Sequence, residues 1–304
     1  MKCFRVDLLV FRIDTSRGGG VGMTINTIGV LGSGVMGGGI AQTAAMAGFT
    51  VVLIDVEQRF ADNAVKQIES YLDKRVANEK MSIAEKERVL ARITAKSDVA
   101  GFAEADFVVE SVVEDITVKK KVFAEMDQVC RPEVVIATNT SSMSITDIAS
   151  ATNRQERVAG MHFFIPPTIM EIVEIARGYY TSDATVLAVK SVVERMGKKG
   201  VVVEKDTPGF IANRVYTPLL LEAFKVYEEG IASREDIDAA MKLAYKLPIG
   251  PFELADYIGL DTLNNALEYF QSELGARWSP PQSLKRLVKA GRLGRKTGKG
   301  WYAY

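Results

Sequence analysis

The sequence predicts an α/β fold, in which a doubly wound sheet domain is followed by an all-α C-terminal domain. In the first two thirds of the chain, short apolar runs typical of buried strands alternate with segments of helical periodicity. After Phe210 this alternation stops, and helical patterns with short breaks continue to the end of the chain. We therefore place the domain boundary near Thr207-Pro208 and predict domains at residues 24–207 and 208–304.

Composition limits the class of protein. The chain has 304 residues, of which 47% are hydrophobic, enough for two packed domains at roughly 150 residues each. Its 38 basic and 38 acidic residues give no net charge, so electrostatics offers no reason to expect nucleic acid or a membrane surface as a partner. Cys3 and Cys130 make no metal or disulfide pattern, and no apolar run reaches the roughly 18 residues that span a bilayer. We expect a soluble cytoplasmic protein without a metal.

The start of the chain does not share these patterns. Leu8-Leu-Val-Phe11 is too short for the apolar part of a secretory signal. The glycine-rich run Ser16-Arg-Gly-Gly-Gly-Val-Gly22 leads into Met23, as a translated purine-rich ribosome-binding site would. We expect residues 1–23 to be an N-terminal extension that is not native or is disordered, with Met23 as the natural initiator. N-terminal sequencing of native protein that begins at Met1 would contradict this hypothesis.

A glycine-rich turn and an acid mark the first part of the sheet domain. A strand, the turn, a small-residue helix and a second strand follow one another at residues 27–31, 32–37, 38–47 and 50–54. Gly32, Gly34 and Gly37 permit a tight turn, close approach of the backbone to a pyrophosphate at the helix N-terminus, and close packing of the helix. Asp55 is placed to bind an adenosine ribose and to repel a 2′-phosphate. The order predicts a Rossmann-type domain that binds NAD rather than NADP; the alternative is a glycine-rich turn beside a surface aspartate.

Two helices are predicted after this acid. Residues 57–78 repeat apolar side chains at helical spacing, and Ser82-Ile-Ala-Glu85 is a capping box that opens the second helix. The polar face of the first helix carries Lys66, Lys74 and Arg75. This basic face would either contact a phosphorylated substrate or remain solvated.

Two further strands deliver polar side chains to the sheet edge where ligands bind in this class of fold. Glu114 and Lys119 follow strand 105–113, either beside the nicotinamide ribose or as an ordinary ion pair at a helix start. Strand 133–138 leads into Asn139-Thr-Ser-Ser142. We expect Ser142 or Ser144 to cap the helix over residues 145–149, which leaves Ser141 free to face the ligand.

The only histidine of the chain, His162, lies in a buried strand predicted at residues 157–164. A second strand at 169–176 carries Glu174, and Pro166-Pro167 forces a turn between the two, so the two side chains would lie side by side. Histidine is the commonest general base, and a carboxylate partner fixes its tautomer. The alternative is a core histidine satisfied by a backbone carbonyl.

The rest of the chain is mainly helical. A capped helix at 182–196 and a strand at 200–205 complete the sheet domain. Helix 210–229 is apolar on most faces, so we expect it to be buried, in the core or in a subunit interface, and to bend at Pro218. Ser233 opens another helix, and a rigid loop at 247–252 precedes a further one.

These stretches together resemble the short-chain L-3-hydroxyacyl-CoA dehydrogenases, and in particular the bacterial 3-hydroxybutyryl-CoA dehydrogenases. The resemblance covers Thr24 to Tyr304 and keeps the order of the family's motifs. The motifs are Gly32-Ser-Gly-Val-Met-Gly-Gly-Gly-Ile-Ala-Gln42, Asn139-Thr-Ser-Ser142, Gly160-Met-His-Phe-Phe164, Asp206-Thr-Pro-Gly-Phe210, Pro248-Ile-Gly-Pro-Phe-Glu-Leu254 with Asp256-Tyr-Ile-Gly-Leu-Asp261, and Gly294-Arg-Lys-Thr-Gly-Lys-Gly-Trp-Tyr302.

The resemblance implies a role for individual residues. His162 corresponds to the catalytic base, which takes the proton of the C3 hydroxyl while hydride leaves C3, and Glu174 to the carboxylate that orients it. Ser141 resembles the serine that bonds the reacting oxygen, and Asn213 the asparagine that helps to hold the substrate. The NAD-binding positions are Gly32, Gly34, Gly37 and Asp55, with Glu114 and Lys119 on the nicotinamide-ribose side. The resemblance also implies an acyl-CoA substrate and a homodimer formed through the C-terminal domain.

The sequence departs from the family at Ile165, where an asparagine is usual, and Glu171 stands where a lysine is common. Tyr71 stands where a serine of the CoA site is common, so the CoA contacts cannot be assigned. A 3-dehydrogenase of a hydroxy acid without CoA, such as gulonate, is therefore an alternative with the same chemistry. A non-catalytic, crystallin-like structural protein is a second alternative, which does not explain why His162, Glu174, Ser141 and Asn213 are all kept.

Overall fold

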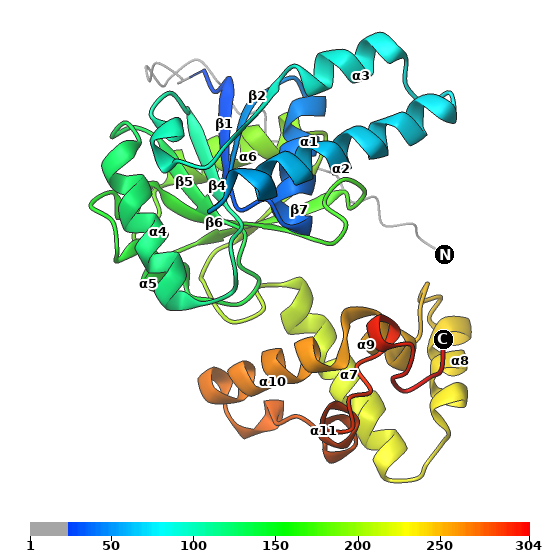
Figure 1. The fold of residues 1–304 in the computed structure, drawn as a ribbon. Helices are drawn as coiled ribbons and strands as arrows, with labels where there is room; N and C mark the ends of the chain where they lie inside the picture. The colour runs from blue at the N-terminus through cyan, green and yellow to red at the C-terminus, as the bar shows by residue number, and fades with distance from the viewer. Residues whose placement is uncertain (1–23) are drawn as a thin grey trace, which may run out of the picture.

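A computed structural model describes residues 24–304, and the predicted N-terminal extension at 1–23, with Cys3, lies outside the described residues. Figure 1 shows a sheet domain, coloured blue to green, and a helical domain, coloured yellow to red. Together they confirm the predicted α/β fold class, with a Rossmann-type sheet followed by helices.

The sheet has eight strands in the order β3-β2-β1-β4-β5-β6-β7-β8. All neighbouring pairs are parallel except β6 and β7, which are antiparallel because only a short turn connects them. The strands are β1 (Thr27–Leu31), β2 (Thr50–Ile54), β3 (Ile93–Lys96), β4 (Phe107–Glu110), β5 (Val135–Thr138), β6 (Val158–Phe163), β7 (Ile172–Arg177) and β8 (Lys199–Val203).

Helices cover both faces of this sheet (Figure 1). One apolar cluster joins alternate strand residues to α1, α2, α3 and α6, and a second joins the opposite strand face to α4 and α5. Strands buried on both faces explain the continuous apolar runs of the sequence. The bounds are α1 (Val35–Met46), α2 (Gln58–Ala77), α3 (Ile83–Leu90), α4 (Ile116–Val129), α5 (Ile145–Ala149) and α6 (Asp183–Arg195).

The sequence did not predict β3. This strand has four residues, Ile-Thr-Ala-Lys, that alternate between half-buried and exposed positions at the edge of the sheet. An edge strand of this length lacks the apolar run by which the central strands were predicted. The other strands occur where the sequence predicts them, within a few residues at each end.

The helical domain has its own core. It consists of α7 (Ala212–Glu228), α8 (Arg234–Ala244), α9 (Pro251–Ile258), α10 (Leu260–Leu274) and α11 (Gln282–Lys289). Phe224, Phe252 and Trp301 are buried in one aromatic cluster at its centre. The expectation of helix throughout this part is wrong after α11, where turns and two isolated bridges follow. Three glycines with positive φ, Gly291, Gly294 and Gly298, explain why the helix does not continue.

Helix α7 is only partly buried, in contrast to the expectation from its composition. Leu220 and Phe224 are 2% and 0% exposed, whereas Val215 on the other side is 72% exposed and Ile211 before the helix is 43% exposed. The single chain therefore leaves apolar surface on α7 uncovered.

The described part of the chain contains no helix long and apolar enough to cross a membrane. Residues 24–304 also contain no group of three or more histidine, cysteine, aspartate or glutamate side chains arranged to hold a metal ion.

Candidate active site

His162 and Glu174 form a buried pair in the sheet. They lie directly opposite each other on β6 and β7, and His162 Nδ1 lies 2.8 Å from Glu174 Oε2. His162 is 5% exposed and Glu174 is 1% exposed. The turn at Pro166-Pro167 thus produces the contact that the sequence predicts, and the bonded partner of the imidazole is a carboxylate rather than a backbone carbonyl. Because Nδ1 donates to a carboxylate, the neutral imidazole has its lone pair on Nε2, where it can accept a proton.

The other oxygen of Glu174 binds the helical domain. Oε1 accepts hydrogen bonds from the backbone N–H groups of Ile211, at 3.0 Å, and Ala212, at 2.7 Å. These groups open α7, which has no side-chain cap of its own. An anion at a helix N-terminus is stabilised by the free N–H groups and the helix dipole. Glu174 therefore contacts the histidine through one oxygen and the start of α7 through the other.

Two aromatic rings enclose the imidazole. Phe164 lies 4.5 Å and Phe210 lies 5.7 Å from His162, measured between ring centroids. Phe210 is 2% exposed and belongs to the core of the sheet domain, although it follows the last strand. The rings restrict the orientation of the imidazole and reduce the access of water to it.

The loop after β5 is held against the histidine strand. Asn139 accepts a hydrogen bond from the backbone N–H of Phe163, next to His162, at 2.8 Å. Of the two serines predicted to cap α5, Ser142 and Ser144, it is Ser144 that accepts a hydrogen bond from the backbone N–H of Asp147. Ser141 is half-buried, and its hydroxyl makes no hydrogen bond with residues 24–304. The hydroxyl is therefore available to bond a ligand. Asn213 is also half-buried, in the first turn of α7, next to Ala212.

The glycine-rich turn lies between the end of β1 and the start of α1. Gly32 has φ +93°, and a Cβ on Gly37 would lie 1.8 Å from the carbonyl oxygen of Gly32, so both positions need glycine. A Cβ on Gly34 would contact nothing within 4 Å. Gly34 therefore has open space beside it at the uncapped N-terminus of α1, which fits a pyrophosphate.

Asp55 follows β2 and is joined to this turn. Its Oδ2 accepts hydrogen bonds from the backbone N–H and the hydroxyl of Ser33, each at 2.6 Å. The sequence prediction did not include Ser33, and a serine inside a glycine motif gave no signal for such a role. Asp55 is half-buried, so the hydrogen bonds from Ser33 hold its carboxylate in place while a ligand can still contact it.

Glu114 and Lys119 form the ion pair that the sequence offered as one of two alternatives. Lys119 Nζ lies 3.2 Å from Glu114 Oε2 and 2.7 Å from Glu110 Oε1, and the Lys119 side chain is 1% exposed. The Glu114 side chain, in the loop after β4, is 42% exposed. Glu110 lies within the predicted strand 105–113 and was given no role from the sequence, and its burial with a lysine nine residues away was not predicted.

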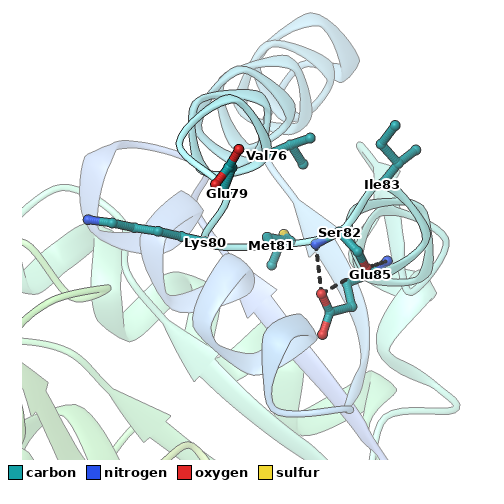
Figure 2. A pocket seen from close by; sticks show the side chains of 7 residues that line it. All are labelled: Val76, Glu79, Lys80, Met81, Ser82, Ile83 and Glu85. Carbon is teal, nitrogen blue, oxygen red and sulfur yellow. Dashed lines mark hydrogen bonds between the residues drawn. The ribbon is translucent and has the colours of Figure 1, made fainter.

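Two surface hollows lie outside this cluster. The first is an open hollow at the turn from α2 to α3, and Figure 2 shows Ser82 and Glu85 of the predicted capping box beside it. It contains none of the predicted site residues. The second, between α2, the loop before β7 and the end of α6, includes Arg75, Glu171 and Lys198. Burial lowers the pKa of Lys198, and the nearby charge of Glu171 partly offsets this shift. Lys198 Nζ donates a hydrogen bond to the carbonyl of Met170 at 2.6 Å.

The geometry fits a reaction in which a proton and a hydride leave the same alcohol. A histidine backed by a carboxylate can hold the proton near neutral pH. A glycine-rich turn followed by an acid can hold a dinucleotide.

Comparisons with known proteins agree with this description. The family model for the NAD-binding domain of 3-hydroxyacyl-CoA dehydrogenase matches residues 27–207, and the model for its C-terminal domain matches residues 209–304. A probable 3-hydroxybutyryl-CoA dehydrogenase of Bacillus subtilis is 43% identical over 283 residues, which cover 93% of this chain and 98% of that protein. The human mitochondrial hydroxyacyl-coenzyme A dehydrogenase is 42% identical over 290 residues, which cover 92% and 91%.

A solved structure shows the same fold. The crystal structure of (S)-3-hydroxybutyryl-CoA dehydrogenase from Ralstonia eutropha has a TM-score of 0.90 and 41% identity, and the match covers 92% of this chain and 99% of that one. The family models, the relatives and the fold agree across both domains. The chain therefore belongs to the 3-hydroxyacyl-CoA dehydrogenase family of NAD-dependent oxidoreductases.

Proposed function

We propose that this enzyme interconverts short-chain (S)-3-hydroxyacyl-CoA, principally 3-hydroxybutyryl-CoA, and 3-oxoacyl-CoA, with His162 and Glu174 as the general acid/base pair. The observation that carries the proposal is the contact between His162 Nδ1 and Glu174 Oε2 in a buried setting. The names of the relatives supply the substrate class.

In the oxidation direction, NAD held at the glycine-rich turn and Asp55 would supply the acceptor for the hydride of C3. His162 Nε2 takes the proton of the C3 hydroxyl, and Glu174 stabilises the imidazolium that results. Ser141 donates a hydrogen bond to the reacting oxygen, and Asn213, in the first turn of α7, helps to hold the substrate. In the reverse direction, imidazolium at His162 returns the proton to the oxygen at C3.

Cofactor selection is assigned to Asp55. The contacts with Ser33 leave this carboxylate beside the glycine-rich turn, where the adenosine ribose lies in a Rossmann-type domain. A carboxylate binds the ribose diol and repels a 2′-phosphate, so we expect NAD to be strongly preferred over NADP. Glu114 and Lys119 are proposed to lie on the nicotinamide-ribose side, with Glu114 as the more accessible of the two.

The first test follows NADH oxidation with acetoacetyl-CoA, with NADPH in a parallel reaction. We expect rapid oxidation of NADH and little of NADPH. Activity with NADPH alone would contradict the role of Asp55 but not the chemistry. Because Ile165 is 59% exposed where the family usually has asparagine, gulonate is tested beside the acyl-CoA. Turnover of gulonate without turnover of acyl-CoA would show that the substrate is a hydroxy acid without CoA. No turnover of either would favour a non-catalytic structural protein.

We also infer a cytoplasmic homodimer formed through the helical domain. The exposed Ile211 and Val215 of the α7 region are the apolar surface that supports it. We expect sedimentation equilibrium at micromolar concentration to give twice the mass of one chain. A mass of one chain at all concentrations would contradict the dimer.

A further inference from the structure

A buried lysine pairs with two carboxylates, one of which contacts the loop that carries the proposed substrate residue Ser141. Lys119 lies in the first turn of α4, and its ammonium group contacts two carboxylates, those of Glu110 and Glu114. Its side chain is 1% exposed, so the two carboxylates, rather than water, stabilise its charge.

Glu110 is the fully buried member of this cluster. It ends β4, and its side chain is 0% exposed. Oε1 accepts from Lys119 Nζ and from the backbone N–H of Val112, each at 2.7 Å, and Oε2 accepts from the Thr138 hydroxyl at 2.6 Å. Thr138 ends the neighbouring strand β5, so one carboxylate connects the ends of two strands with the start of α4.

Glu114 carries the connection to the proposed substrate serine. Its Oε2 faces Lys119, while its Oε1 accepts from the Thr140 hydroxyl and, at 3.3 Å, from the backbone N–H of Ser141. The same loop reaches the catalytic strand through Asn139, which accepts from the N–H of Phe163. The position of the Ser141 loop thus depends on where Glu114 lies.

We propose that Glu110 is a positioning residue, which shares the charge of Lys119 with Glu114 and so holds Glu114 and the Ser141 loop in place for cofactor and substrate. The inference rests on the proposed function for the roles of Glu114 and Ser141. Because Glu110 pairs with Lys119, Glu114 keeps one oxygen for Thr140 and Ser141. If a neutral side chain replaced Glu110, Lys119 would keep Glu114 as its remaining anionic partner and would draw it away from the loop.

The test compares Glu110→Gln with Asp127→Asn. Asp127 lies in the last turn of the same helix, and its Oδ1 lies 2.6 Å from Arg154 Nε in a pair whose side chains are 8% and 9% exposed. Both substitutions convert a carboxylate of a buried ion pair into an amide, so both are expected to lower Tm. Only Glu110→Gln is expected to reduce kcat/KM for acetoacetyl-CoA, by roughly tenfold or more, and to weaken NADH binding, because only that pair connects to the site.

Activity is measured well below the Tm of each variant, and the Kd of NADH is measured separately by fluorescence. If Glu110→Gln lost no more activity and no more NADH affinity than Asp127→Asn, Glu110 would have a stabilising role only and the proposal would be wrong. Should Glu110→Gln fail to fold, Thr138→Val removes one hydrogen bond from the same carboxylate and is expected to change activity in the same direction. Wild-type enzyme without dehydrogenase activity would contradict the proposed function, whereas the NADH Kd would still test the positioning of Glu114.

Discussion

The variant His162→Gln is expected to lose roughly a thousandfold in kcat, the range that general acid/base catalysis contributes. Glutamine is also able to bond Glu174, because its amide N–H₂ can donate to Oε2, so the β6–β7 pairing should persist. An amide can neither accept nor supply a proton near neutral pH. In the oxidation direction the C3 hydroxyl would have to release its proton to water, and in the reduction direction the alkoxide that forms at C3 would have to take a proton from water. The effect therefore falls on the chemical step and not on the fold.

The measurement is single-turnover oxidation of NADH with acetoacetyl-CoA, with the Kd of NADH determined in parallel. NADH binding should stay within about twofold of wild type, because the glycine-rich turn and Asp55 follow β1 and β2, whereas His162 lies on β6. Loss of NADH binding together with activity would show that the histidine has a structural role. Turnover close to wild type would remove His162 from the mechanism.

The pairing of His162 with Glu174 could be predicted because strand geometry determines it. Two buried strands joined by a turn at Pro166-Pro167 run antiparallel, and side chains that lie opposite each other share a face. The glycine-rich turn was predictable for a similar reason, since strand, turn, helix and acid have a fixed order in this fold. Both inferences needed only local sequence and the period of a strand.

The contacts that the sequence did not predict join residues whose spacing carries no periodic signal. Glu174 caps α7 through Ile211 and Ala212, 37 and 38 residues away, and Thr138 reaches Glu110 across 28 residues. A glutamate at the end of a buried strand is equally consistent with a solvated or a buried carboxylate. Only the position of Lys119 in three dimensions decides between the two.

The partial exposure of α7 has a different origin. Apolar composition predicts that a helix is covered, but it does not say whether the same chain or a second copy covers it. Leu220 and Phe224 are covered by the helical domain, whereas Val215 is not. The sequence analysis expected this helix to be buried either in the core or in a subunit interface. The sedimentation measurement tests whether a second copy covers the part that the single chain leaves exposed.

The second large effect is expected for Glu174→Gln, with roughly a hundredfold loss in kcat and retention of the fold. The amide oxygen of glutamine can still accept from the N–H groups of Ile211 and Ala212, which are now the contacts of Oε1. The amide nitrogen then faces His162 Nδ1 and can only donate, so Nδ1 must accept and the proton of the neutral imidazole moves to Nε2. In that tautomer Nε2 cannot take the proton of the substrate, and the charge that stabilised the imidazolium is gone as well.

Two variants separate this catalytic role from the role of Glu174 at α7. Glu174→Gln should unfold at nearly the wild-type temperature and bind NADH normally, while its kcat falls. Glu174→Ala also leaves the two backbone N–H groups without a partner, at a cost of about 1–3 kcal/mol for each donor that remains buried, so its Tm should fall too. A Glu174→Gln enzyme with wild-type kcat would refute the orientation of His162 by this carboxylate. Equal losses of Tm in both variants would show that the charge of Glu174, rather than its ability to accept hydrogen bonds, holds the start of α7 against the sheet.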